Sequence, residues 1–351
     1  MTGVEAHGGW PVLLGTITAR HDLSREAAAA AMADILAGQA TPAQIAGLIV
    51  GLRLKGESVE EMTGMVTAMR AAAEPLAVPA GTIDIVGTGG SDHRRRHALN
   101  VSTMASIVAA AAGAVVCKHG NRRASSTSGS FDFLEAIGVE GELSPADLER
   151  CIADVGVGFA FARTYHPAMR FAGPVRAELG IPTVFNVLGP LANPGRVDRQ
   201  VVGAASAELA ASMAEVLLNL GSRHAWVVAG HGGLDELSTT GPAVVYEVTV
   251  GGVRRFGVDP ADLGLAPVAS LDELTGGSPE DNAAIFAAIL DGSERGARYE
   301  IVVLNAGAGL VVAGIAATLS EGVRAAADAV ADGRAADTLR RLVATTNPVP
   351  S

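Results

Sequence analysis

The sequence predicts an α/β protein made of a small all-helical domain and a large α/β domain with a mainly parallel central sheet. Residues 23–73 carry a helical pattern throughout, whereas beyond residue 79 short β-branched runs alternate with helical segments. The 43 glycines and the 4% share of aromatic residues are typical of tightly packed α/β proteins, in which backbones approach one another closely. A chain of 351 residues is long enough for one large domain or two unequal ones.

The helical region has well-marked helix starts. Thr41 and Gln44 have the spacing of a capping box, with Pro42 at the first helical position, and Ser58 and Glu61 repeat the box for the next helix. The proline-containing segment 74–79 cannot continue a helix, so we interpret it as the crossing into a second unit.

In the second unit we expect strands at residues 83–86, 114–117, 226–229 and 301–304. A helix should begin at Ser144 and Pro145, the chain turns helical again between prolines at 174–194, and 241–277 suggests strands and turns at a sheet edge. The expected domains are residues 1–78, a small helical domain joined by about 167–195, and residues 79–166 with 196–351, the large domain.

Charge and cysteine content exclude several classes of function. The formal net charge is −11, and the run Arg94–Arg96 is the one dense basic cluster of the sequence, which argues against a nucleic-acid partner. Cys117 and Cys151 are too few and too far apart for a disulfide framework or a zinc site. Residues 1–14 lack a basic segment followed by a long apolar one, so we expect a soluble, cytoplasmic protein with no membrane partner.

A glycine turn, GTGG at 87–90, follows the first expected strand, where open α/β sheets bind their ligands. It matches neither a dinucleotide-binding fingerprint nor a Walker loop. The next helix starts with Asn100, Ser102 and Thr103, whose polar groups and free N–H groups suit a phosphate. The alternative is a plain glycine turn followed by an ordinary helix cap.

Two further strand ends carry polar motifs. KHGNRRASSTSGS at 118–130 offers Lys118 as a point charge among many hydroxyl and backbone donors, so two strand ends indicate a polyphosphate ligand. His119 alone is more often a structural histidine. Asp235 and Glu236, in GHGGLDE at 230–236, are oxygen ligands suited to Mg²⁺ that also holds phosphate. Their alternative is a negative charge at a helix N-terminus.

These motifs occur together with YHPAMR at 165–170, PVRAELGIPTVFNVLGPLANP at 174–194, HGGLDELS at 231–238 and DNAA at 281–284. In this order they make the chain resemble the anthranilate phosphoribosyltransferase family, from the helices near residue 23 to Asn305-Ala306-Gly307. The resemblance implies transfer of 5-phosphoribosyl from phosphoribosyl pyrophosphate to anthranilate in tryptophan biosynthesis. It also implies Mg²⁺ as cofactor and a homodimer formed through the helical domain.

The resemblance also implies a set of site residues. Those for phosphoribosyl pyrophosphate are Gly87, Gly90, Ser91, Asn100, Ser102, Thr103, Lys118, Asn121, Ser125, Ser126 and Ser130. Those for anthranilate are Gly87, Asn121 and Arg176, and those for the metal are Ser102, Asp235 and Glu236. No catalytic acid or base is implied, because such a site works mainly by electrostatics and alignment.

The chain departs from the family pattern in its first loop. Ten residues, 91–100, stand where the pattern has seven, with Ser91 in the usual acidic position, Asp92 in place of glycine and Ala98 in place of threonine. Arg163 replaces a proline before YHPAMR. Our hypothesis is that Arg94–Arg96 supply contacts to the diphosphate, and the alternative is a solvated loop whose arginines contact nothing.

Three functions therefore stay open at the level of the sequence. The first is phosphoribosyl transfer to anthranilate. The second is a paralogue that uses another aromatic acceptor or a nucleoside. The third is a catalytically silent relative that binds phosphate or nucleic acid. Lys118, Arg176, Asp235 and Glu236 favour the first over the third.

Overall fold

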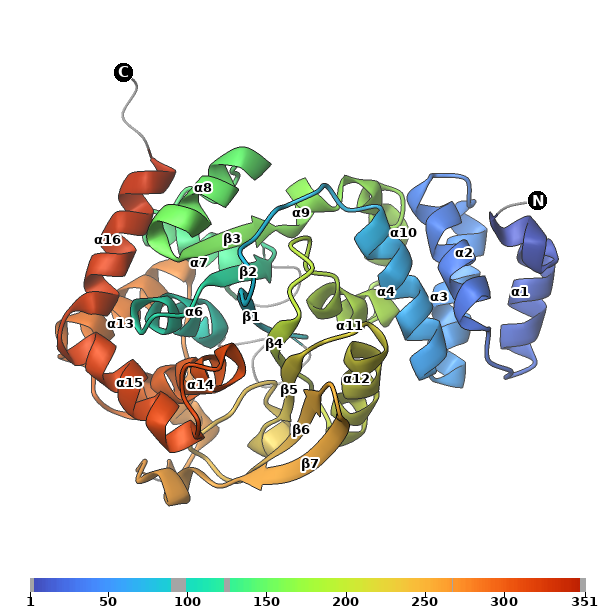
Figure 1. Ribbon diagram of the computed structural model, residues 1–351. Coiled ribbons are helices and arrows are strands. Elements are labelled where there is room, and N and C mark those ends of the chain that lie inside the picture. Colours follow the sequence, from blue (N-terminus) through green and yellow to red (C-terminus); the bar gives the residue numbers. More distant parts are fainter. Residues whose placement is uncertain (1–2, 90–98, 123–126, 267, 348–351) are drawn as a thin grey trace.

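The computed structural model describes residues 3–89, 99–122, 127–266 and 268–347. Short helices gather at the N-terminal end of the chain, beside the sheet-containing part (Figure 1). These elements are η1 (Gly3–His7), α1 (Gly9–Thr18), α2 (Arg25–Leu36), α3 (Pro42–Lys55) and α4 (Val59–Ala71). The start of α1 carries no capping signature, because Gly8 stands at its N-cap without a side chain.

Both predicted capping boxes are present. Thr41 Oγ1 accepts from the N–H of Gln44 while Gln44 Oε1 accepts from the N–H of Thr41, and Ser58 and Glu61 pair in the same way. Glu61 does more than cap, because its buried carboxylate also accepts from the N–H of Leu23 at 2.9 Å and from Lys55 Nζ at 2.9 Å. One side chain at the start of α4 therefore bonds to the segment just before α2 and to the end of α3.

A seven-stranded sheet forms the centre of the larger part, in the order β3-β2-β1-β4-β5-β6-β7. The first five strands of the chain run parallel, whereas β6 and β7 form an antiparallel edge. The strands are β1 (Ile83–Gly87), β2 (Val116–Gly120), β3 (Val157–Phe161), β4 (Arg199–Gly203), β5 (His224–Ala229), β6 (Ala243–Thr249) and β7 (Gly252–Val258).

Helices cover both faces of the sheet (Figure 1). Trp226 and Val228 of β5 belong to one apolar cluster, with α6 (Val101–Ala111) and α14 (Ala297–Ala313), and the alternating Ala225 and Val227 belong to another, with α12 (Ala207–Asn219). This alternation is what a sheet buried on both faces requires. The second cluster continues into α2, α3 and α4, so the N-terminal helices share a core with this face of the sheet.

The remaining elements connect the strands or complete the layers. They are α7 (Ser130–Ala136), α8 (Pro145–Val155), α9 (Ala162–Tyr165), η2 (Pro167–Arg170), α10 (Gly173–Leu179), α11 (Val184–Leu191), η3 (His231–Gly233), η4 (Pro260–Leu263), η5 (Leu271–Leu274), α13 (Pro279–Asp291), α15 (Leu319–Ala331) and α16 (Arg334–Thr346). Within the described ranges, no helix is both long and apolar enough to cross a bilayer.

The fold class is as predicted, but two strand predictions need correction. Residues 301–304 are not a strand, because they lie inside α14, where every residue from Ile301 to Val312 is buried. A helix that is apolar all round has no helical period in its sequence and looks like a buried strand. The strand expected at 114–117 begins instead at Val116 and includes Lys118 and His119. The predicted domain boundaries stay a prediction.

Candidate active site

The candidate site lies at the carboxyl ends of β1 and β4. The chain passes from β1 to β2 and β3 in one direction and continues through β4 and β5 on the other side, so the strand order reverses between β1 and β4. Open α/β sheets bind ligands at such a reversal point. Gly87 and Gly203, the last residues of β1 and β4, are register partners there.

Both glycines are needed because Asp235 lies directly over them. A Cβ on Gly203 would come within 1.6 Å of the main-chain oxygen of Asp235, and one on Gly87 within 2.5 Å of its Oδ2. The N–H of Gly89 donates to the same Oδ2 at 2.7 Å. The glycine turn after β1 therefore holds a carboxylate in place.

The turn after β5 folds back over the sheet. The N–H of Gly230 donates to the Leu234 carbonyl at 2.8 Å, and both main-chain polar groups of Leu237 pair with the side chain of Asn305 in α14. Asp235 and Glu236 are consequently buried, with 4% and 8% of their surface exposed. No helix starts at Asp235 and Glu236, so the alternative that these two carboxylates place negative charge at a helix N-terminus is wrong.

Lys118 lies in β2 with 2% of its surface exposed, and its Nζ donates to the Ile85 carbonyl at 2.7 Å. Burial lowers the pKa of Lys118, and Asp84, Glu236 and Asp235 offset only part of that shift. Burial raises the pKa of Asp84 to about 6, opposed first by Lys118 and then by Asn193, whose Nδ2 donates to Asp84 Oδ2 at 2.8 Å. The lysine charge thus lies among carboxylates.

His119, the next residue of β2, has a different environment. Its Nδ1 pairs with the Gly189 carbonyl of α11 at 3.1 Å, and its ring centroid lies 5.1 Å from that of His166. Burial, with smaller contributions from His166 and Lys118, lowers the pKa of His119 to about 3. The imidazole is therefore neutral near pH 7. Its Nε2 is buried and has no hydrogen-bond partner among the residues that the structure describes.

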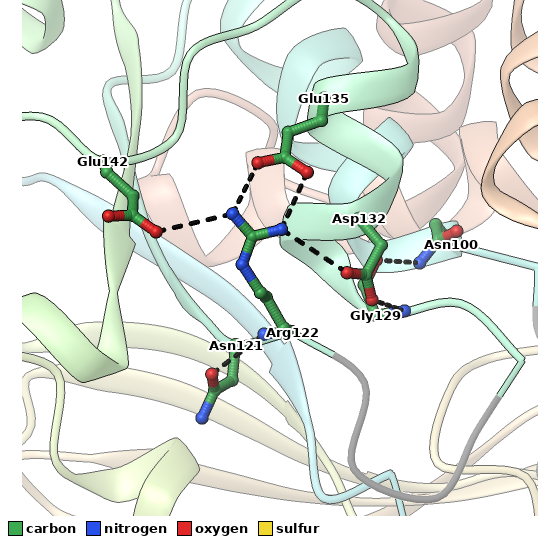
Figure 2. A network of polar contacts seen from close by, with 7 residues as sticks. All are labelled: Asn100, Asn121, Arg122, Gly129, Asp132, Glu135 and Glu142. Carbon is green, nitrogen blue, oxygen red and sulfur yellow. Dashed lines mark hydrogen bonds and ion pairs between the residues drawn. The ribbon is translucent and has the colours of Figure 1, made fainter.

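Arg122 anchors the chain just after β2 (Figure 2). Its guanidinium donates two hydrogen bonds to the Glu135 carboxylate of α7, one of them 2.7 Å long. It also lies 3.4 Å from a carboxylate oxygen of Glu142 and 3.7 Å from one of Asp132. Asp132 in turn accepts from the N–H of Gly129 at 3.0 Å. Arg122 and Gly129 are thereby both held by side chains of α7, whose first residue is Ser130.

Asn100 stands at the N-cap of α6, but its side chain does not cap that helix. Its Nδ2 donates to the Gly129 carbonyl at 3.3 Å, and its Oδ1 accepts from Ser128 Oγ at 2.8 Å. The alternative of an ordinary side-chain cap is therefore wrong. Ser102 and Thr103 follow in the first turn of α6, so the starts of α6 and α7 lie together.

Arg176 lies in α10, where its guanidinium carbon is 5.1 Å above the Phe185 ring of α11. Burial lowers the pKa of this arginine. The other end of α11 carries Gly189, which contacts His119, so α11 connects Arg176 to the end of β2. Asn121 follows β2 directly, and its carbonyl accepts from the N–H of Phe131 at 3.4 Å.

The structure thus gathers most of the predicted residues at one edge of the sheet. Gly90, Ser91, Ser125, Ser126 and the run Arg94–Arg96 lie outside the described residues. Across the described ranges, no group of three or more His, Cys, Asp or Glu side chains could hold a metal alone. Two adjacent carboxylates fit an ion that takes its other ligands from phosphate and water, as Mg²⁺ does. Asp84, Asn193 and Asn282 are not among the site residues that the sequence predicts, because their contacts depend on the fold.

Comparison with known proteins defines the class. Residues 80–336 match the α/β domain of a glycosyl transferase family, and residues 11–73 match the helical bundle domain of that family. The chain belongs to this family. The anthranilate phosphoribosyltransferase of Methylorubrum extorquens is 50% identical over 334 residues, which cover 95% of this chain and 98% of the relative.

Solved structures agree with this comparison. The anthranilate phosphoribosyltransferase of Thermus thermophilus is 45% identical, with a TM-score of 0.88 over 95% of this chain and 98% of that one. The enzyme from Saccharomyces cerevisiae, in complex with phosphoribosyl pyrophosphate and Mg, is 26% identical, with a TM-score of 0.82 over 93% of each chain.

Proposed function

We propose that this protein transfers the 5-phosphoribosyl group from phosphoribosyl pyrophosphate to anthranilate. The products are N-(5-phosphoribosyl)anthranilate and pyrophosphate, the cofactor is Mg²⁺, and the pathway is tryptophan biosynthesis. Relatives with that activity are 50% identical over 95% of the chain. The observation that carries the proposal is the buried Asp235 carboxylate, held by Gly89 over the ends of β1 and β4.

The donor would bind where the starts of α6 and α7 meet the ends of β1 and β2. A helix start offers N–H groups and a positive dipole end to the diphosphate, and Lys118 adds a charge. We assign to the donor Gly87, Asn100, Ser102, Thr103, Lys118, Asn121 and Ser130, together with Gly90, Ser91, Ser125 and Ser126.

Asp235, Glu236 and Ser102 would hold Mg²⁺, which neutralises the leaving diphosphate when it is bound. This donor set suits the ion, because two carboxylates and a hydroxyl leave positions for phosphate oxygens. The same two carboxylates oppose the lowering of the Lys118 pKa that burial causes.

Anthranilate would bind with its carboxylate at Arg176, whose planar fork can contact both oxygens, and near Gly87 and Asn121. The acceptor amine is neutral and nucleophilic at pH 7, so placing it beside the anomeric carbon matters more than a strong base. The low pKa of His119 agrees with this, since an imidazole whose conjugate acid has a pKa of about 3 is a weak base.

We further propose a cytoplasmic homodimer formed through the N-terminal helices. Two apolar side chains in that region are exposed, Val12 of α1 by 52% and Leu54 of α3 by 72%. Covering them would remove apolar surface from water, which favours association.

The test is to incubate the purified protein with anthranilate, phosphoribosyl pyrophosphate and Mg²⁺ and to follow the loss of anthranilate fluorescence. We expect turnover that requires all three components. Turnover only with another aromatic acceptor or a nucleoside would contradict the substrate assignment. Binding of RNA or DNA at physiological salt, without turnover, would support a silent relative instead.

The metal assignment is tested with the double variant Asp235→Asn, Glu236→Gln. We expect at least about a 100-fold loss of turnover, because charge stabilisation at the leaving group is removed, with the fold retained by circular dichroism. The matched control is Asp272→Asn, Glu273→Gln, an exposed adjacent pair in η5 that should keep full activity. Normal turnover of the first variant at limiting Mg²⁺ would remove the assignment.

A further inference from the structure

The segment DNAA at 281–284 has no role in the site described so far, yet one of its side chains reaches that site. Asn282 lies in the first turn of α13 and is fully buried. Its Nδ2 donates to Asn100 Oδ1 at 2.7 Å, and its own Oδ1 accepts from the N–H of Gly277 at 3.2 Å. A residue far along the chain thus contacts the N-cap of α6.

These contacts form a chain of hydrogen bonds with one possible direction. The N–H of Gly277 can only donate, so Asn282 must turn its oxygen toward Gly277 and its Nδ2 toward Asn100. Asn100 must then present its oxygen to Asn282, and its Nδ2 faces the Gly129 carbonyl, which can only accept. Ser128 Oγ donates to the same Asn100 oxygen. The Gly277 N–H at one end of this series and the Gly129 carbonyl at the other therefore require the same orientation of the Asn282 and Asn100 amides.

This series of hydrogen bonds, from Gly277 through Asn282 and Asn100 to Gly129, determines how two elements of the donor site meet. Asn100 begins α6, which carries Ser102 and Thr103, and Gly129 begins α7, which carries Ser130. The side chain of Asn100 joins the two helix starts instead of capping its own helix (Figure 2). If Asn282 did not fix the Asn100 amide, that amide could turn over and present its oxygen to the Gly129 carbonyl, which would repel it.

We propose that Asn282 is a positioning residue for the phosphoribosyl pyrophosphate site. It acts through the Asn100 amide and holds the start of α7 against the start of α6, and this inference rests on the proposed function of the site. Asn282 itself lies behind Asn100 and need not contact substrate.

The test is calorimetric titration of phosphoribosyl pyrophosphate with Mg²⁺ into the unchanged protein and into Asn282→Ala. We expect the donor Kd to rise on the order of tenfold, as for loss of one well-oriented buried hydrogen bond. In steady-state kinetics the donor KM should rise with it, while the anthranilate KM stays close to its original value. The matched control, Asn219→Ala, replaces a surface asparagine of α12 and should leave both KM values unchanged.

A double-mutant cycle separates positioning from general stability. If Asn282 acts through Asn100, then Asn282→Ala should not weaken donor binding further in a chain that already carries Asn100→Ala. If the two substitutions weaken donor binding additively, Asn282 does not act through Asn100 and the proposal is wrong. If Asn282→Ala does not fold, the isosteric Asn282→Asp replaces it, since its carboxylate cannot donate to Asn100.

Two failures can be told apart. If the unchanged protein binds phosphoribosyl pyrophosphate and Asn282→Ala binds it equally well, with only its melting temperature lowered, Asn282 is structural and the inference is wrong. If the unchanged protein does not bind the donor, the proposed function fails and the inference falls with it.

Discussion

Lys118 and His119 are neighbours in β2, and burial affects them differently because their partners differ. Side chains of adjacent strand residues point to opposite faces of the sheet. Burial lowers the pKa of both residues, but Asp84, Glu236 and Asp235 oppose this shift at Lys118, whereas His166 and Lys118 add to it at His119. One residue can therefore serve as a charge in the site, and the other stays neutral.

The neutral burial of His119 predicts a pH dependence of stability. Its pKa in the folded state, about 3, lies below the ordinary value of 6.5, so the unfolded state binds the proton first as the pH falls. Stability is therefore full above about pH 6.5 and is lost toward pH 3, with about 2 kcal/mol lost between pH 7 and pH 5. Urea unfolding at both pH values should show this loss in the unchanged protein but a smaller one in His119→Gln.

The control for this measurement is His21→Gln, at an exposed position before α2. This variant should keep the difference between pH 7 and pH 5 that the unchanged protein has. An equally large difference in His119→Gln would mean that other groups cause the acid sensitivity.

Arg176 provides a prediction about the acceptor. Arg176→Ala should raise the anthranilate KM by one to two orders of magnitude, as expected for loss of a charge-assisted contact of about 1.5–3 kcal/mol. Donor affinity should change little. Arg176→Lys keeps the charge without the planar fork, so it should recover only part of the loss. A fall in donor affinity instead would show that the two substrates are assigned the wrong way round.

At the scale of elements, the site depends on the close approach of the turn after β5 to the ends of β1 and β4. Gly87 and Gly203 leave room for Asp235, and Asn305 of α14 holds the following residue, Leu237. The strands, the turn and the buried helix therefore fix one carboxylate together. A substitution that moves any of these elements should move the Asp235 carboxylate and so weaken Mg²⁺ binding.

Gly203→Ala tests this approach. The new Cβ would collide with the main chain of Asp235, so the turn must move, at a cost of about 1–3 kcal/mol in stability. Turnover should fall more than stability alone explains, and the Mg²⁺ concentration for half-maximal activity should rise. Gly15→Ala in α1 is the control, because a Cβ there meets nothing within 4 Å. Unchanged Mg²⁺ dependence in Gly203→Ala would argue against a metal at Asp235.

Arg122 tests the anchoring of the 118–130 motif to α7. Arg122→Gln should raise the donor KM several-fold, because α7 loses its link through Glu135 to the residues that follow β2 (Figure 2). The melting temperature should change little, since partly exposed ion pairs contribute only about 0–1 kcal/mol. Arg150→Gln, which removes an exposed pair with Asp147 in α8, should change neither quantity. A large fall in melting temperature with no change in donor KM would contradict the anchoring role.

At the scale of the whole molecule, the N-terminal helices lie at one end, and the β6–β7 hairpin forms the edge of the sheet, beside α12 (Figure 1). The helices expose Leu54, whereas the hairpin turn exposes Val250 by 85%. The proposed dimer would cover Leu54 and leave Val250 exposed. Val250 is therefore an apolar control position of similar exposure outside the proposed interface.

Leu54→Glu should convert the dimer into a monomer, because a charge would be buried in an apolar interface. Sedimentation equilibrium measures this directly at several protein concentrations. Val250→Glu should remain as dimeric as the unchanged protein. A monomeric unchanged protein, or a dimeric Leu54→Glu, would contradict an interface at Leu54.

Local sequence signals predicted the parts of this molecule that depend on local chemistry. The capping boxes at Thr41 and Ser58 are of this kind, since neighbouring residues make the contacts. Residues 301–304 carry the sequence pattern of a strand although they lie in α14, because full burial removes the period that marks a helix. The start of α1 was missed because glycine offers no capping side chain.

The candidate site was predictable only in its outline. Motifs at strand ends indicated where polar residues gather, since parallel strands end at the same edge. The hydrogen bonds of Lys118 to Ile85, of Asn193 to Asp84 and of Asn282 to Asn100 join residues far apart in sequence. Such pairs depend on how the layers pack, and no spacing rule in a single sequence reveals them.

The position of α10 and α11 has a consequence for how a new acceptor preference could arise. These helices carry Arg176 and Phe185, and they also pack against α3 and α4 of the N-terminal unit. Laboratory evolution toward a bulkier acceptor would have to shift them, and each shift would disturb a shared core. We therefore expect adaptive substitutions to accumulate in α3 and α4 as well as beside the ligand, so libraries restricted to ligand-facing codons would omit them.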